Sequence, residues 1–306
     1  MKHQPWRRDA AAYPTQGTLQ PRFNDVDLWQ HLNNVAQIGL HGELLQQWLH
    51  AHLGPDPWRR ASPKLVVQAN ATDFLAEAHY PAPLATGTRL LGCDDHRLTL
   101  ATALFQHGHC TGLHQATLGA FDGDTAVPLP ADWRAALQSA AALQPPLAGA
   151  GDGAPDALPD LPAPPHPDQW PWQITLGTRF ADADGQGHAS DFSLARCAEQ
   201  GRVQFLTQVF GDGRRSAPVG FMVAHVALRW HQRRLPPTPP RAWQLGIGVT
   251  KVGERSLAVG SALFDGADCV ATSTSVMVVI DHATRRPAAM SAEARALLAP
   301  YLHAPA

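Results

Sequence analysis

The chain has 306 residues, enough for about two domains of ordinary size, and apolar residues make up 44% of it. Charged residues make up 16% and the formal net charge is −2, so neither a nucleic acid nor a membrane surface is expected as a partner. No apolar run follows the charged N-terminus, and no stretch reaches the roughly 18 apolar residues of a membrane-spanning helix. We therefore expect a cytoplasmic protein.

The cysteines and histidines show no pattern of a metal centre. Cys93, Cys110, Cys197 and Cys269 lie far apart in the sequence, which predicts reduced, buried thiols. Of the sixteen histidines, only those in residues 107–110 cluster, at a position where a hairpin turn is expected. A solvated turn explains that cluster better than a metal site, so no metal or cofactor is predicted.

An internal repeat is visible in the sequence. Residues 22–34 read RFNDVDLWQHLNN and residues 179–191 read RFADADGQGHASD. The Arg, the Phe, two Asp and the His recur 157 positions apart. Later matches, such as Ala-Leu-Phe at 103–105 and 262–264, recur 159 positions apart. One unit followed by a diverged copy predicts two domains of the same fold.

The predicted elements of the first copy follow its motif. Ile38, Leu45, Trp48 and Leu49 recur near a period of 3.6, which predicts a helix. Alternating side chains then predict strands over 98–104 and 111–121, with a turn between them. Together with a short strand before the motif, they indicate an α+β unit with one helix packed on an antiparallel sheet.

The second copy predicts the same elements after a linker. Residues 138–168 are rich in Ala, Pro, Gly and Asp, which is typical of a semi-extended tether. The domains are therefore predicted at 1–137 and 169–306. A helix is predicted over 195–209, with Arg202 interrupting its apolar face, and strands over 243–250, 257–263 and 270–280.

The pattern Arg-Phe-x-Asp-x-Asp-x-x-x-His, with a helix and a sheet behind it, resembles the hotdog thioesterase superfamily. The most similar branches are the 4-hydroxybenzoyl-CoA thioesterase-like and acyl-ACP thioesterase-like proteins. Residues 27–34 resemble the acyl-ACP motif Asp-x-Asn-x-His-x-Asn-Asn, and residues 179–188 resemble the bacterial acyl-CoA type. The resemblance implies two hotdog domains in tandem, each a long helix wrapped by a curved antiparallel sheet, packed as an intramolecular pseudo-dimer. Further assembly into a homo-oligomer stays open.

The resemblance also implies the catalytic residues. Asp27 and Asp184 would be general bases or nucleophiles, with His31 and His188 beside them. Unpaired N–H groups at a helix start favour developing negative charge, and the resemblance implies that the backbone at 30–31 and 187–188 holds the carbonyl oxygen. An Asp in this position is also an ordinary helix cap, and a diverged copy can keep the pattern after losing activity.

Residues next to these positions favour capping or substrate binding. Capping is the preferred role for Asn33, Asn34, Ser190 and Asp191. Trp29 stands where the acyl-ACP branch has a catalytic Asn, and its indole is interpreted as closing the acyl pocket. Gly187 precedes the histidine in the second copy only, and it is taken as a substrate-binding position.

A basic segment follows in the second copy. Arg229, Arg233 and Arg234 suit the phosphates of coenzyme A, and Trp230 between them suits its adenine. A solvated loop with a buried Trp explains the same segment equally well.

The function implied by the resemblance is hydrolysis of an acyl-CoA or acyl-ACP thioester to the free acid and the thiol, as in fatty acid metabolism. Two alternatives stay open: a non-catalytic acyl-CoA-binding protein and, less favoured, an enoyl-CoA hydratase-type enzyme. The hydratase branch spaces its Asp and His five positions apart with a Pro between them. Here both pairs are four apart, without Pro. The sequence leaves the acyl group undetermined.

Overall fold

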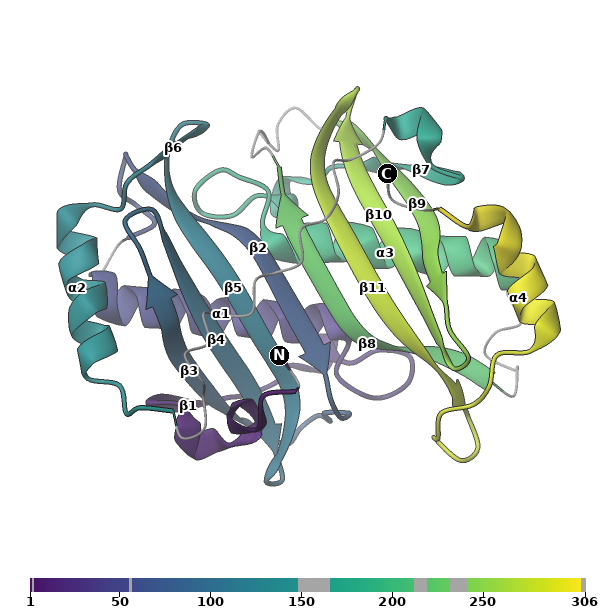
Figure 1. Ribbon diagram of the computed structural model, residues 1–306, viewed down its shortest axis with the longest axis horizontal. Coiled ribbons are helices and arrows are strands. Elements are labelled where there is room, and N and C mark those ends of the chain that lie inside the picture. Colours follow the sequence, from purple (N-terminus) through teal and green to yellow (C-terminus); the bar gives the residue numbers. More distant parts are fainter. Residues whose placement is uncertain (2, 55–56, 148–165, 212–218, 232–240, 304–306) are drawn as a thin grey trace. The chain divides into compact units, whose positions relative to one another are not determined.

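The computed structural model describes residues 1, 3–54, 57–147, 166–211, 219–231 and 241–303. Two compact units divide the chain, residues 1–159 and residues 160–306 (Figure 1). No helix among the described residues is long and apolar enough to span a membrane.

The first unit is one antiparallel sheet with a long helix behind it (Figure 1). The sheet order is β1-β3-β4-β5-β2, and β6 pairs with β5. Short 3-10 turns lie at Pro5–Arg8, Ala10–Ala12 and Phe23–Asp25. The elements are β1 (Thr15–Leu19), α1 (Asn34–Leu53), β2 (Lys64–Phe74), β3 (Leu84–Cys93), β4 (Arg97–Gln106), β5 (His109–Asp122), β6 (Thr125–Val127) and α2 (Ala131–Ala142).

The second unit repeats this arrangement. Its sheet order is β7-β9-β10-β11-β8, all antiparallel, and α3 lies behind it. Its 3-10 turns lie at Pro167–Gln169, Phe180–Asp182 and Ala299–Tyr301. The elements are β7 (Trp172–Gly177), α3 (Asp191–Phe210), β8 (Val219–Trp230), β9 (Ala242–Val252), β10 (Ser256–Asp265), β11 (Asp268–Asp281) and α4 (Ala292–Leu298). The predicted α+β class and the helix-on-sheet unit are confirmed for both copies.

The C-terminal half of α1 carries the apolar anchor of the first unit. Leu45, Trp48 and Leu49 are buried against strand residues such as Leu98 and Leu118. Burial of each such side chain stabilises the fold by about 1.5–3 kcal/mol, so this half of the helix is fixed on the sheet. The repeated motif, which ends where α1 begins, is thereby joined to a helix that is held in place.

Three details differ from the sequence prediction. Helix α2 continues through Ala142, beyond the predicted start of the linker at 138, and the Gln144 side chain bonds both backbone groups of Leu90. Residues 148–165 of the predicted linker lie outside the described residues. Strands β2, β3, β6 and β8 were not predicted; in β2, buried polar side chains such as Asn70 interrupt the apolar alternation. Cys93 is exposed at the end of β3, so the prediction of four buried thiols is wrong there.

Candidate active site

The repeated motif begins with an Arg–Asp pair that shapes the chain before the helix. In the first copy Arg22 donates its backbone N–H to Asp25 Oδ2 at 2.7 Å and its guanidinium Nη2 to Oδ1 at 2.8 Å. Asp25 is only 3% exposed, and its backbone carbonyl accepts the N–H of Asn33 at 2.8 Å. The first Asp of the motif is therefore an anchor for the backbone and not a reacting group.

The second copy has the same anchor. Arg179 donates its backbone N–H to Asp182 Oδ2 at 2.7 Å and Nη2 to Oδ1 at 3.0 Å. The carbonyl of Asp182 accepts the N–H of Ser190 at 3.0 Å. Since both copies keep this geometry, the Arg and the first Asp of the motif have a structural role.

Replacing Asp25 with Ala is expected to lower the free energy of unfolding by about 2–3 kcal/mol, because a buried, charge-assisted set of hydrogen bonds is lost. Urea denaturation followed by circular dichroism measures this change. Glu43→Ala, at an exposed position on α1, is the matched control and should change stability by less than about 0.5 kcal/mol. Equal effects of the two substitutions would show that Asp25 is not an anchor.

The second Asp of the motif closes a tight turn with the histidine. Asp27 donates its N–H to the His31 carbonyl at 3.0 Å, and Gln30 donates its N–H to the Asp27 carbonyl at 3.0 Å. The Asp27 Oδ1 atom accepts the N–H of Trp29 at 2.8 Å. Gln30 has a φ of 67°, a left-handed conformation that is unfavourable for a residue with a side chain.

In the second copy Gly187 takes this left-handed position, with a φ of 79°. Asp184 donates to the His188 carbonyl at 2.7 Å, and Gly187 donates to the Asp184 carbonyl at 3.0 Å. The Asp184 Oδ1 atom accepts the N–H groups of Gln186 at 2.8 Å and His188 at 3.0 Å. The two turns therefore have one backbone geometry, and the glycine of the second copy meets it without steric cost.

Replacing Gln30 with Gly is expected to maintain or raise the free energy of unfolding, by up to about 1 kcal/mol, because it removes the strain of the left-handed residue. The reciprocal change, Gly187→Gln, should lower the stability by about 1 kcal/mol. Thermal unfolding of both variants measures the two effects. A clear loss of stability in Gln30→Gly would mean that the Gln30 side chain holds the turn.

The first copy brings the predicted catalytic side chains together. His31 Nδ1 lies 3.3 Å from Asp27 Oδ2, and these side chains are 15% and 20% exposed. A carboxylate and an imidazole at this distance can share a proton, and their partial exposure leaves them accessible to a substrate. In the second copy the backbone N–H of His188 donates to Asp184 Oδ1 at 3.0 Å.

The predicted binding of the carbonyl oxygen by the backbone at 187–188 is not what the structure shows. Both N–H groups donate within the turn, that of Gly187 to the Asp184 carbonyl and that of His188 to the Asp184 carboxylate. The N–H of Gln30 in the first copy is used in the same way. These donors build the turn that orients the carboxylate.

The predicted caps are partly confirmed. Asn33 Oδ1 accepts the N–H groups of Val35 at 2.6 Å and Ala36 at 3.2 Å, and Ser190 Oγ accepts that of Ser193 at 3.0 Å. Asn34 and Asp191 are the first residues inside their helices and not caps.

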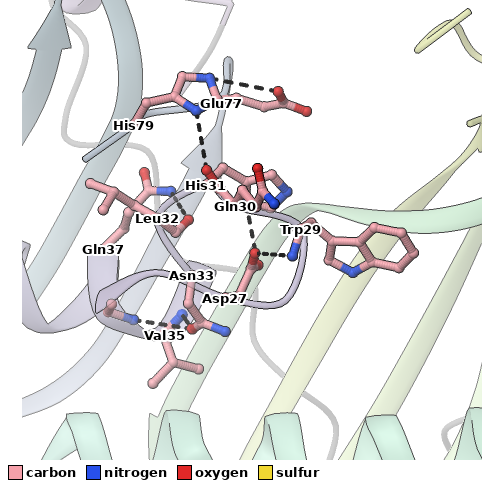
Figure 2. A network of polar contacts seen from close by, with 11 residues as sticks. Asp27, Trp29, Gln30, His31, Leu32, Asn33, Val35, Gln37, Glu77 and His79 are labelled. Atoms are coloured by element: carbon pink, nitrogen blue, oxygen red, sulfur yellow. Dashed lines mark hydrogen bonds and ion pairs between the residues drawn. The ribbon is translucent and has the colours of Figure 1, made fainter. Parts of the chain in front are cut away.

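The predicted substrate-binding residues lie in different environments. Trp29 is 45% exposed, and its indole extends away from the Asp27 carboxylate (Figure 2). Arg229 is half-buried on strand β8, so the alternative of a solvated loop is wrong at this position. Trp230 is only 8% exposed and donates its indole N–H to Asp191 Oδ1 at 2.6 Å, so it offers no face for an adenine ring. Arg233 and Arg234 lie outside the described residues.

A supporting loop between β2 and β3 was missed by the sequence analysis. The carbonyl of Ala78 accepts the N–H of Leu32 at 2.7 Å, and His79 Nδ1 lies 3.4 Å from the Gln30 carbonyl. Gln106 fixes this loop, since it accepts the N–H of His79 at 2.8 Å and donates to the His79 carbonyl at 2.8 Å. The loop follows the motif by about fifty positions, so spacing alone gave no signal for it.

No group of three or more His, Cys, Asp or Glu side chains within the described ranges is arranged to hold a metal ion.

Comparison with known proteins identifies the first unit. Residues 21–137, which include Asp27 and His31, match the family model of the Thioesterase-like superfamily. This part of the chain is therefore similar to the proteins of that superfamily. Thioester hydrolysis is the class of reaction that the match supports. A search among curated protein sequences finds no match.

Solved structures show that the likeness in fold extends over both units. A 12:0-ACP thioesterase from Umbellularia californica has a TM-score of 0.64 at 11% identity, over 90% of this chain and 94% of its own. A protein described as an oleoyl thioesterase from Lactobacillus plantarum has a TM-score of 0.63 at 11% identity, over 88% and 97% of the two chains. An acyl-ACP thioesterase from Bacteroides thetaiotaomicron has a TM-score of 0.59 at 12% identity, over 86% and 97%. The tandem hotdog fold is thereby confirmed.

Proposed function

We propose that the protein hydrolyses an acyl thioester of coenzyme A or of an acyl carrier protein, with Asp27 and Asp184 as the reacting carboxylates. The observation that carries the proposal is the Asp27–His31 pair, 3.3 Å apart within the part of the chain that matches the thioesterase-like family. The same turn geometry at Asp184 supports a second site in the second unit.

The chemistry at the first site needs a single proton acceptor. Asp27 Oδ2 accepts a proton from a water molecule, whose oxygen adds to the thioester carbonyl carbon. The carbon–sulfur bond then breaks, and the proton passes from the carboxyl group to the departing thiolate. His31 beside the carboxylate orients it and shares the proton. Direct attack by Asp27, through an acyl anhydride that water then hydrolyses, uses the same geometry.

Two features of the turn suit this role. The backbone N–H of Trp29 holds Oδ1, so the carboxyl group keeps one rotation and presents Oδ2 to His31. His31 and Asp27 are partly shielded from water, which strengthens the electrostatic interaction between the pair and a developing charge.

The more detailed part of the proposal concerns the group that carries the acyl chain, which is either coenzyme A or an acyl carrier protein. Two of the structurally similar proteins are described as acyl-ACP thioesterases, which favours testing a carrier protein beside coenzyme A. Arg229 on β8 is the described member of the predicted phosphate-binding residues, and a guanidinium group suits a phosphate of either carrier.

Thiol release from matched acyl-CoA and acyl-carrier-protein substrates, with the products identified by mass spectrometry, tests the proposal. The expected products are the free acid and the thiol. Binding of the thioester without release would favour the alternative of an acyl-CoA-binding protein. A product that keeps the thioester and gains one water would indicate a hydratase instead.

A further inference from the structure

A buried polar cluster lies between α1 and its sheet, beside the proposed reaction site. Gln37 and His41 project from the first turns of α1, and four strand residues face them across the interior of the unit. All six side chains are buried. The strand members are Asn70 and Thr72 on β2, Thr102 on β4 and His114 on β5.

Part of the cluster is satisfied internally. His41 Nδ1 lies 2.7 Å from Thr102 Oγ1, and His114 Nδ1 lies 2.8 Å from Thr72 Oγ1. The two imidazole rings stack with their centroids 5.0 Å apart and an angle of 12° between the planes. Burial lowers the pKa of both rings, that of His114 to about 3, so both are neutral in the folded protein.

Three buried atoms of the cluster have no hydrogen-bond partner among the described residues: Gln37 Oε1, His41 Nε2 and Asn70 Oδ1. Two of them face one spot, because a Cβ atom on Gly112 would lie 3.2 Å from His41 Nε2 and 3.4 Å from Gln37 Oε1. Each buried polar atom without a partner costs about 1–3 kcal/mol. Their convergence indicates a site for a group that both donates and accepts a hydrogen bond.

The second unit shows what the same positions look like without this cluster. At the repeat offsets, Leu194 and Ala198 replace Gln37 and His41 on the helix. Ser261 and Ser273 replace Thr102 and His114, and they bond each other at 2.6 Å. The open polar atoms are thus a feature of the first copy and not a requirement of the fold.

The cluster is connected directly to the reaction site. Gln37 donates its Nε2 to the carbonyl of Leu32 at 3.1 Å, and Leu32 follows His31 in the sequence (Figure 2). This bond also fixes the amide so that Oε1 faces the interior. The turn that holds Asp27 and His31 and the cluster therefore lie at the same end of α1.

We propose that the first unit selects acyl groups that carry a hydroxyl, and that the cluster binds this hydroxyl. The hydroxyl donates to Gln37 Oε1 and accepts from His41 Nε2–H, with the Thr102 hydroxyl donating to His41 Nδ1. The inference rests on the proposed thioesterase function and specifies its substrate class. A buried water molecule would satisfy the same atoms, so the test has to separate the two.

The test is calorimetric binding of non-hydrolysable thioether analogues of acyl-CoA, one series with a hydroxyl at successive carbons and one without. The wild type should bind the best hydroxylated analogue about tenfold or more tightly than its unsubstituted match, the worth of one buried hydrogen bond. Gln37→Leu and His41→Ala, which introduce the residues of the second unit, should abolish the difference. Glu43→Ala on the exposed side of the same helix should keep it.

Equal binding of both series by the wild type, or binding of neither, overturns the inference and leaves only a structural water. A preference that survives in both Gln37→Leu and His41→Ala, with circular dichroism showing native helix content, also overturns it. Thiol release from unsubstituted acyl-CoA by the wild type is measured in parallel. Its absence with every thioester contradicts the proposed function, whereas its presence without a hydroxyl preference contradicts only this inference.

Discussion

Asp27→Asn is expected to lower the turnover of the first site by about 100- to 10,000-fold, the range that a positioned general base contributes, so the activity that remains in this variant is that of the second site. The substitution keeps an oxygen that can accept the N–H of Trp29, so the turn is preserved while the charge and the proton acceptor are lost. Steady-state thiol release measures the change. Circular dichroism and thermal unfolding should match the wild type.

The matched control separates catalysis from structure. Asp27→Ala removes the turn bond as well as the charge, so it should lose the same activity and also some stability. Asp184→Asn, at the equivalent turn of the second unit, reports how much turnover that unit supplies. If Asp27→Asn and Asp184→Asn both keep full activity on the same substrate, neither residue takes part in the reaction.

Lowering the pH from 7 to 5 is expected to reduce the stability of the first unit by about 4 kcal/mol through His41 and His114 alone. Burial lowers the pKa of both rings in the folded state, and the stacked His114 lowers that of His41 further. The unfolded chain binds a proton at each ring below pH 6.5, whereas the folded chain does not. The stabilisation is therefore complete above pH 6.5 and is lost progressively as the pH falls below it.

Hydrogen exchange of α1 and β5 at pH 5, 6 and 7, after correction for the intrinsic exchange rate, measures this effect locally. The double variant His41→Ala/His114→Ser carries the residues that the second unit has at these positions, and its stability should depend less on pH. The same pH dependence in the variant and the wild type would show that these two rings do not cause the acid sensitivity.

The sequence predicted the elements whose residues repeat with a clear period. The helix around Leu45 and the strands around Leu98 and Leu257 follow from apolar periodicity, and they occur as predicted. The longer missed strands β2, β3 and β8 mix apolar and polar residues, as at Asn70, Arg89 and Arg229. Such polar residues fit into a strand because of partners that lie far away in the sequence. A local sequence pattern does not reveal those partners.

The candidate site was also predicted only in part from the sequence. The motif predicted Asp27 and His31, because two copies keep the same residue types at the same spacing, and the structure brings their side chains together. The repeat alone does not separate the buried anchor Asp25 from the partly exposed Asp27, and only the family resemblance assigned the reaction to Asp27. The roles differ only through contacts, since Asp25 is held by Arg22 and Asp27 by the turn.

The most direct test of the central claim is thiol release by the wild type against the double variant Asp27→Asn/Asp184→Asn, over a panel of acyl-CoA and acyl-carrier-protein substrates. If the repeated Asp is the reacting group, the wild type releases thiol and the double variant releases it at least about 100-fold more slowly at unchanged stability. Equal release by the two proteins would contradict the assignment of the repeated Asp as the reacting group. No release by the wild type with any thioester would contradict the hydrolase function itself.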